Sequence, residues 1–359
     1  MKKLNTYINE KLKIGKVTYT CHPKNKYELR EILEERLSKD KNAYLNDIDV
    51  SQITDMGLDN NKSLFEDLDP HDIDISRWDV FNVTDMHGMF SDCNNFNCDL
   101  SDWNVSNVRD MTLMFSGCHK FNCDLGDWKV SKVTDMRWMF YKCENFDCDL
   151  SNWDVSNVED MSGMFQDCEN FNCDLRGWDV SNVKDTIFMF RDCKNFEGKG
   201  LENWNMSNAQ QISSMFMGCK KFNSDLSNWD VSNVIDMSGL FFGCENFNCD
   251  LGNWDVSKVE DMSVMFKGCK KFNSDLSNWD VSNVKDMSGL FFGCENFNCD
   301  LSTWDTSKVE DLGNTFRDCK QFNCDINNWK VKRLKRMKNT FNNSGLVNNI
   351  PKWYKLKTV

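Results

Sequence analysis

Tryptophan recurs along this chain at a fixed spacing, and that spacing constrains the fold more than any other feature of the sequence. Eleven tryptophans, from Trp78 to Trp329, follow one another at 25 residues, with a single step of 26. A representative unit is 247–271, FNCDLGNWDVSKVEDMSVMFKGCKK. Such a period is typical of solenoids, whose short units bury too little apolar surface to fold alone and therefore stack. We predict one elongated core for the 359 residues.

Two apolar periodicities alternate within each unit. Phe247, Cys249 and Leu251 are separated by polar residues, which predicts a short half-buried strand. Residues 256–269 carry apolar side chains at steps of three and four, which predicts a short helix or helical turn. The predicted fold class is therefore an α/β repeat solenoid, leucine-rich-repeat-like, with one short parallel strand and one short helix or helical turn per 25-residue rung. We expect a structural ladder of stacked tryptophans: Trp103, Trp128, Trp153, Trp178, Trp204, Trp229, Trp254, Trp279, Trp304 and Trp329.

The two ends of the chain depart from the repeat, as solenoid ends do when they protect an exposed terminal rung. Residues 26–38 have the pattern of an amphipathic helix, and Ile48 stands where later units have tryptophan. The predicted organisation is an N-terminal extension with a helical cap at 1–43, a repeat solenoid at 44–346 with a degenerate first repeat at 44–69 and an irregular repeat at 196–221, and a C-terminal cap at 347–359.

Charge and composition exclude several functions. The net charge of -13 argues against nucleic acid as a partner, because phosphate binding needs clusters of Lys and Arg. The sequence has no run of 18 apolar residues and no apolar segment after its basic N-terminus, so we expect neither a membrane span nor a secretory signal. A cytoplasmic protein is the resulting expectation, with surface or virion association as the alternative.

The phrase WDVSNV, followed by DM, MF and Gly-Cys or a close variant, recurs in order, for example from Trp153 to Val158 and then at Asp160, Met161, Met164 and Phe165. This pattern resembles the BspA-like leucine-rich repeats, the group that includes the mycoplasma-type surface-protein repeat. The resemblance covers most of residues 70–346. It implies attachment or protein contacts, in bacterial surface proteins, some eukaryotic microbes and phage, and it carries no catalytic residues.

The eighteen cysteines follow the repeat. Ser224 and Ser274 replace the strand cysteine in two units, which a required disulfide or metal-ligand pair would not tolerate. The sites also lack the histidines and tetrahedral ligand sets that zinc prefers. We interpret the cysteines as mostly free, buried thiols in a core ladder, with disulfides or a metal as alternatives.

A row of aspartates is the sharper candidate for a site. Like charges about 5 Å apart repel, so each carboxylate either accepts hydrogen bonds at the turn that follows it or forms an acidic stripe that binds cations. The sequence favours the first interpretation, and we expect no metal site. The residues of the alternative cation stripe are Asp99, Asp124, Asp149, Asp174, Asp225, Asp250, Asp275 and Asp300.

The irregular repeat supplies the candidate residues for partner binding, because it interrupts an otherwise uniform surface. Its glycines permit a bulge, and two glutamines replace a charged residue and an aspartate. A neutral trace of duplication is the alternative interpretation. The candidates are Gly198, Lys199, Gly200, Gln210 and Gln211.

No catalytic motif surrounds the four histidines, and no phosphate-binding glycine loop or metalloprotease motif is present in the sequence. We therefore predict a non-enzyme without cofactors. The favoured function is a protein-protein interaction or scaffolding module that presents an extended repeat surface. The alternatives are a bacterial surface or phage virion adhesin that binds a host protein or glycan, and a cation-binding structural protein.

Overall fold

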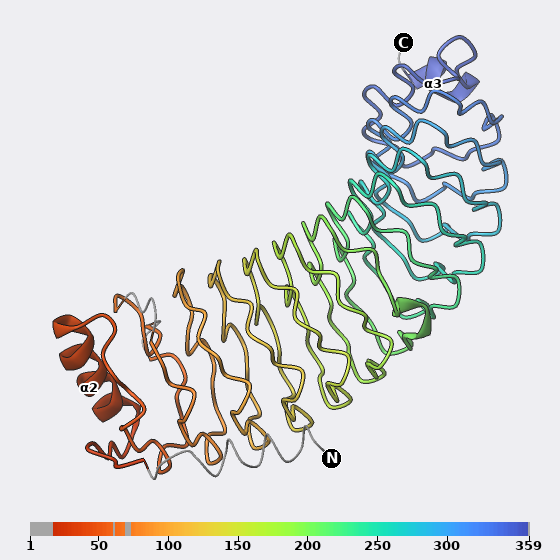
Figure 1. The fold of residues 1–359 in the computed structure, drawn as a ribbon. Helices are drawn as coiled ribbons and strands as arrows, with labels where there is room; N and C mark the ends of the chain where they lie inside the picture. Colours follow the sequence, from red (N-terminus) through yellow and green to blue (C-terminus); the bar gives the residue numbers. More distant parts are fainter. Residues whose placement is uncertain (1–16, 60–61, 69–72, 358–359) are drawn as a thin grey trace, which may run out of the picture.

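The computed structural model describes residues 17–59, 62–68 and 73–357. These residues form a curved rod of stacked rungs, with α2 (Lys26–Lys39) at one end and α3 (Lys352–Lys357) at the other (Figure 1). The first sixteen residues of the predicted N-terminal extension lie outside the described residues. None of the helices within the described ranges is long and apolar enough to cross a bilayer.

Helix α2 covers the first rung. The side chain of Asn25 accepts two backbone N–H groups of the first helical turn, which is the usual way an N-cap begins a helix. Leu29, Leu33 and Leu37 lie one turn apart and are fully buried. Their apolar face closes the end of a core that would otherwise meet water.

One side of every rung is joined to the next by backbone hydrogen bonds. A column of parallel β-bridges runs from Asp55 to Arg336, one residue per rung. In the following turns of a representative rung, Met262, Val264, Phe266 and Gly268 each donate an N–H to a carbonyl of the next rung at 2.7–3.0 Å. We call residues 260–268 and their equivalents the turn ladder, and its outward side the turn face.

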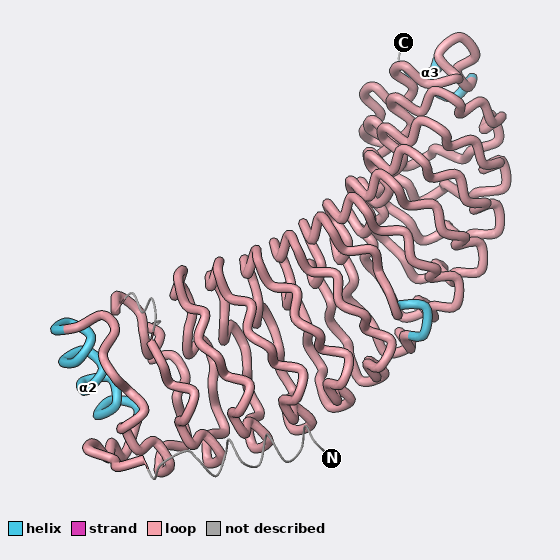
Figure 2. The backbone as a smooth tube through the Cα atoms, in the orientation of Figure 1, coloured by secondary structure: helices cyan, strands magenta, loops and turns pink. Residues whose placement is uncertain are grey.

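The short helix or helical turn predicted for each rung is not formed. Apart from η1 (Leu201–Asn203), the described part of the repeats contains no helix, only turns and extended segments (Figure 2). Val264 and Gly268 have φ values of 50° and 80°, which a right-handed helix cannot continue through. Between these inter-rung donors, the N–H groups of Met265 and Lys267 bond to carbonyls three residues back, so consecutive turns place apolar residues at the steps of three and four that imitate a helix.

The predicted strand is also not found, although the segment is extended. In this segment a column of stacked phenylalanines, from Phe96 to Phe322, has ring centroids 5.7–6.3 Å apart in adjacent rungs. That exceeds the roughly 4.8 Å at which backbones pair in a sheet. Side-chain acceptors bridge this wider gap. The Leu100 N–H donates to Cys123 Sγ of the next rung at 3.1 Å, and Asn97 Oδ1 accepts the Asn122 N–H of the next rung.

The tryptophans form the predicted column. Ring centroids in adjacent rungs are 6.2–6.5 Å apart and the rings are nearly parallel. The Trp153 indole donates its N–H to the Leu125 carbonyl of the previous rung at 2.9 Å, and the other tryptophans of the column repeat this bond. Trp353, in α3, extends the column by stacking on Trp329 at 6.2 Å, so the C-terminal cap continues the ladder.

The bend of the rod follows from unequal spacing across each rung. The distance between equivalent ring centroids in adjacent rungs measures the local spacing of the rungs. It is 5.3–5.8 Å for the phenylalanine column beside the turn ladder but 6.2–6.5 Å for the tryptophans. The tryptophan side is therefore splayed and lies outside the bend. Figure 1 shows η1, which directly precedes Trp204, on that outer side.

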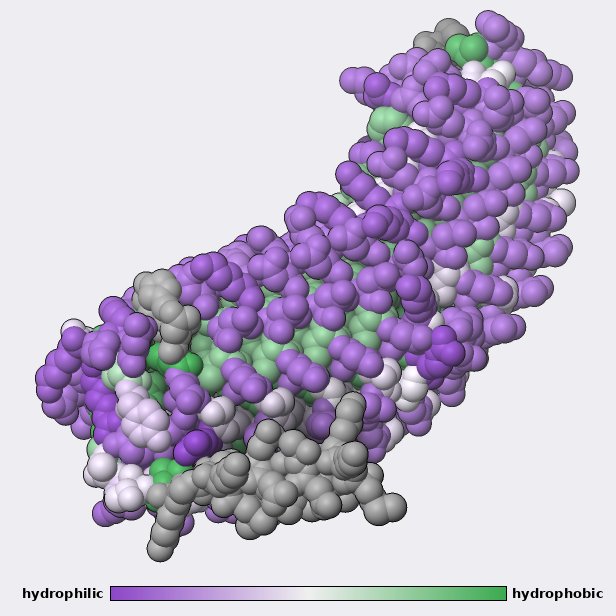
Figure 3. All heavy atoms as spheres, viewed as in Figure 1, coloured by the Kyte–Doolittle hydropathy of each residue, from purple (hydrophilic) through white to green (hydrophobic). Residues whose placement is uncertain are grey.

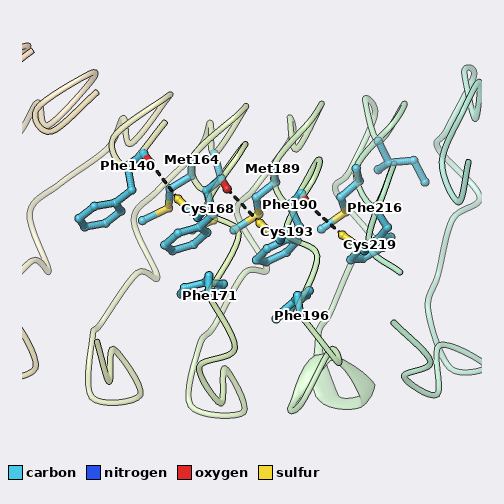
Figure 4. Close-up of a cluster of buried hydrophobic side chains, with 14 of the residues drawn as sticks. Phe140, Met164, Cys168, Phe171, Met189, Phe190, Cys193, Phe196, Phe216 and Cys219 are labelled. Carbon is cyan, nitrogen blue, oxygen red and sulfur yellow. Dashed lines mark hydrogen bonds between the residues drawn. The ribbon is translucent and has the colours of Figure 1, made fainter. Parts of the chain in front are cut away.

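Buried thiols also join the rungs. Cys168 and Cys219 direct Sγ at the carbonyls of Phe140 and Phe190 in the preceding rungs, each at 2.9 Å (Figure 4). Burial raises the pKa of these thiols well above the usual value, so they stay protonated and can donate. All eighteen cysteines fall within the described ranges and are free thiols.

The second cysteine column allows a stability test. Cys148 Sγ accepts the buried Leu125 N–H at 3.1 Å, and in another rung Ser274 Oγ accepts the equivalent N–H of Leu251 at 3.0 Å. Cys148→Ser keeps an acceptor and should change the free energy of unfolding by less than about 1 kcal/mol, whereas Cys148→Ala orphans the N–H and should cost about 1–3 kcal/mol. Urea denaturation measures both, and equal losses would contradict the bridging role.

Candidate functional site

Aspartates close three corners of each rung. In a representative rung, Asp250, Asp255 and Asp261 each accept the N–H of the residue two positions later on Oδ1, at 2.7–3.0 Å. This is the Asx turn, which aspartate forms readily. Much of the acidity of the chain therefore belongs to its corners.

The structure places the predicted aspartate row at one of these corners. Oδ1 of each member accepts a backbone N–H at 2.9–3.1 Å, and Asp174 also pairs with Arg176 at 2.7 Å. Within the described ranges, no group of three or more His, Cys, Asp or Glu side chains is arranged to hold a metal ion.

Figure 3 shows a largely hydrophilic face with a narrow apolar band along the rod.

A second acidic row was not singled out in the sequence. It is the bridge column, the column of parallel β-bridges that runs from Asp55 to Arg336. Burial raises the pKa of Asp160 and Asp261 in this column. Arg137 contacts Asp135 at 2.6 Å and Asp160 at 3.7 Å, which compensates part of the repulsion. The column's hydrogen bonds and ion pairs give it a structural role.

The glycine-rich insertion, 198–200, bulges on the outer side of its rung. The Leu175 N–H donates to the Lys199 carbonyl at 3.0 Å, where most other rungs use a cysteine sulfur and one uses Ser274 Oγ. Gly200 has a φ of 90°, and a Cβ on it would lie 2.1 Å from the Arg176 nitrogen. The insertion therefore replaces a missing side-chain acceptor with a carbonyl, and its glycine is required by close packing.

The two candidate glutamines lie on another part of the same rung. Gln211 takes the place of aspartate in the bridge column, between Asp185 and Asp236. The Gln210 and Gln211 N–H groups donate to the Lys184 carbonyl at 2.9 and 3.2 Å. The structure thus places Gly198, Lys199 and Gly200 on the outer side, Gln211 in the bridge column and Gln210 directly before it.

Aromatic side chains on the turn face were missed by the sequence reasoning. Trp138 and Phe188 lie two rungs apart, yet their ring centroids are 6.4 Å apart, and Tyr141 meets Trp138 edge-on at 5.3 Å. All three are partly exposed. The available signal was Trp138 itself, a tryptophan outside the 25-residue period.

These rings line a groove with a volume of about 680 Å³. Leu113 extends its apolar floor, and Gln166 and Arg191 add polar groups. Lys142 lies 4.9 Å from the Tyr141 ring centre, and Arg191 lies 5.3 Å from that of Phe188. The groove combines an apolar floor with a few polar groups, as binding pockets do.

Stacked rungs with continuous side-chain ladders define a tandem-repeat solenoid. The chain belongs to the family described as "Mycoplasma protein of unknown function, DUF285", which matches residues 29–140, 114–201, 188–286 and 269–359. The comparison with curated proteins returned no match.

Two solved structures are similar over most of their length. One is a leucine-rich repeat protein from Eubacterium ventriosum, with 14% identity, a TM-score of 0.37 and coverage of 88% of this chain and 86% of that one. The other is a leucine-rich repeat protein from Bacteroides ovatus, with 14% identity, a TM-score of 0.34 and coverage of 81% and 80%.

Calcium should have little effect on stability. Because each aspartate of the predicted row already uses Oδ1 at its corner, millimolar calcium should leave the melting temperature within about 1–2 °C of the value in chelator. Differential scanning calorimetry measures this, with magnesium as the control ion. A rise of many degrees specific to calcium would revive the cation-binding interpretation.

Acid should destabilise the protein. The backbone N–H and hydroxyl of the serine two residues on hold the pKa of Asp149, Asp225 and Asp275 below its usual value. A carboxyl whose pKa is lower in the folded state contributes stability above its unfolded pKa of about 3.9 and loses it as the pH falls through the folded pKa. Asp160 and Asp261 have raised pKa values and oppose this effect, but they are outnumbered.

The melting temperature should therefore fall between about pH 5 and pH 3. In the triple variant Asp149→Asn, Asp225→Asn and Asp275→Asn, which keeps an acceptor at each corner, the pH dependence should be shallower. A melting temperature that rises on acidification would show that the corner carboxylates do not carry this linkage.

Proposed function

We propose that the chain is a non-catalytic protein-recognition module whose working surface is the turn face. The proposal rests on which positions of the repeat change from rung to rung. Outer-side residues such as Trp153, Val155 and Leu150 serve the stacking of neighbouring rungs and recur almost unchanged, whereas outward positions of the turn ladder take many side chains.

Two columns on the turn face carry most of this variety. They lie three and six residues after the bridge position, and most of their non-glycine members are partly exposed. The first column comprises Gly88, Leu113, Trp138, Gly163, Phe188, Ser214, Gly239, Val264, Gly289 and Asn314. The second comprises Ser91, Ser116, Tyr141, Gln166, Arg191, Met217, Phe242, Lys267, Phe292 and Arg317.

The kinds of side chain in these columns support a protein partner. Aromatic residues, methionine and arginine are enriched at protein interfaces, and tryptophan, tyrosine and arginine dominate their binding energy. Phe242 and Phe292 both lie close to Lys267, at 4.9 and 5.0 Å to the ring centres, so aromatic and cationic groups alternate along this face. Such a face offers both apolar contact and polar selectivity.

The chemistry of the nucleophile candidates supports a non-catalytic role. Burial raises the pKa of Cys98 and Cys148 to about 11, so these thiols are protonated at neutral pH and are poor nucleophiles. The corner aspartates repeat one hydrogen-bonding environment, whereas acid–base catalysis uses carboxyls whose pKa values are pushed apart.

Affinity capture from an extract of the source organism tests the proposal. The turn-face variant combines Trp138→Asn, Phe188→Asn, Phe242→Ser and Phe292→Ser, and each new residue is one that other rungs carry in the same column. Quantitative mass spectrometry should show a protein that wild type retains and this variant loses by about tenfold or more, since central aromatic residues dominate interfaces.

The matched control changes four exposed outer-side residues that precede the ladder tryptophans: Asn152→Ala, Asn228→Ala, Asn253→Ala and Asn278→Ala. This variant should retain the partner as wild type does. Equal retention by both variants, or no protein retained above an unrelated acidic bait, would refute recognition through the turn face.

A further inference from the structure

The groove of the N-terminal half has an apolar floor that spans several rungs. The Trp138 ring lies across Gly163, because a Cβ at that glycine would fall 2.3 Å from ring atom Cε3. It thereby reaches Phe188, while Leu113 continues the floor on the other side. The missing side chain in the middle rung thus allows rings from separate rungs to form one surface.

The backbone at this floor is held in an unfavourable conformation. Leu113, Trp138 and Phe188 have φ values of 58°, 58° and 59°, in the left-handed region that bulky residues avoid. Glycine occupies the same position at Gly88 and Gly239, so the fold does not require a large side chain there. Strain that the fold could avoid is a reason to look for a function of these side chains.

Gln166 provides a second, independent observation. Its side chain is 8% exposed and lines the groove. Nε2 donates to Asp167 Oδ2 at 3.3 Å, but Oε1 has no hydrogen-bond partner. Buried acceptors in folded proteins are normally satisfied, so this oxygen is available to a donor on a ligand.

The charges around the groove are mostly acidic. Glu66 and Asp92 line it, and Asp167 lies beside it. Of the neighbouring cations, Arg191 pairs with Asp192 at 3.3 Å and Lys142 lies 4.9 Å from the Tyr141 ring centre, so the three carboxylates outnumber the unpaired cations. The electrostatic complement of this rim is a positively charged partner.

We propose that this groove binds a short polypeptide segment that places an apolar or aromatic side chain against Trp138 and Phe188, donates an N–H to Gln166 Oε1, and carries Lys or Arg beside the anchor. The inference rests on the proposed function and narrows it to one site and one partner chemistry. The turn-ladder backbone groups already bond between rungs, so the segment binds through side chains rather than as an added strand.

Phage display of random 12-residue peptides on the full chain tests this inference. Selected peptides should share an apolar residue flanked by Lys or Arg. Synthesised and measured by calorimetry, they should bind Trp138→Asn and Phe188→Asn about tenfold or more weakly, and Gln166→Leu several-fold more weakly. Asn is chosen because Asn314 has a φ of 58° at the equivalent position, so both variants should stay folded.

Asn152→Ala is the matched control, because Asn152 is exposed on the outer side of its rung, away from the groove; this variant should bind the peptides within about twofold of wild type. Near-wild-type melting temperatures verify folding of every variant. No enrichment, peptides without the apolar and basic pattern, or equal binding by the groove variants would overturn the inference. So would binding of arrayed glycans that depends on the same residues and displaces the peptides.

Failure of this inference can be distinguished from failure of the proposed function. If the peptide selection fails while the turn-face variant still loses a protein partner, recognition by the turn face stands and this groove is not its site. If the turn-face variant loses no protein partner in the affinity capture, both the proposed function and this inference fail.

Discussion

The step between rungs governs the structure. Backbone groups of neighbouring rungs hydrogen-bond directly along the turn ladder, where the step is short, whereas the tryptophan side is 6.2–6.5 Å apart and too wide for backbone pairing. There the rungs are joined by asparagine oxygens, cysteine sulfurs and indole N–H groups. The repeated Asn, Cys and Trp residues are thus the means by which a splayed stack satisfies its buried polar groups.

The same division separates structure from recognition. On the wide side, a side chain that bridges two rungs has little freedom to change, because its replacement would leave a buried donor or acceptor unpaired. On the turn face the backbone makes the connections, and the outward side chains are released from that duty. Trp138 and Phe188 can therefore differ from their equivalents in other rungs without loss of the stack, which makes this face suitable for binding.

Charge follows a similar logic. The net charge of -13 arises largely because aspartate closes corners, and not because an acidic site was assembled. Pairs such as Lys270 with Glu245 and Lys320 with Glu295, each on adjacent rungs, also join neighbouring rungs at the surface.

The sequence alone determined that the units stack, that tryptophan forms a column and that residues near 26–38 form a helix, because these follow from a period and from local patterning. It did not determine the path within a rung. Apolar steps of three and four fit a chain of turns as well as a helix, and only the stacked structure shows that Val264 and Gly268 take left-handed conformations that direct N–H groups to the next rung. The groove was equally hidden, since Trp138 and Phe188 are 50 residues apart and meet only because Gly163 lies between them in the stack.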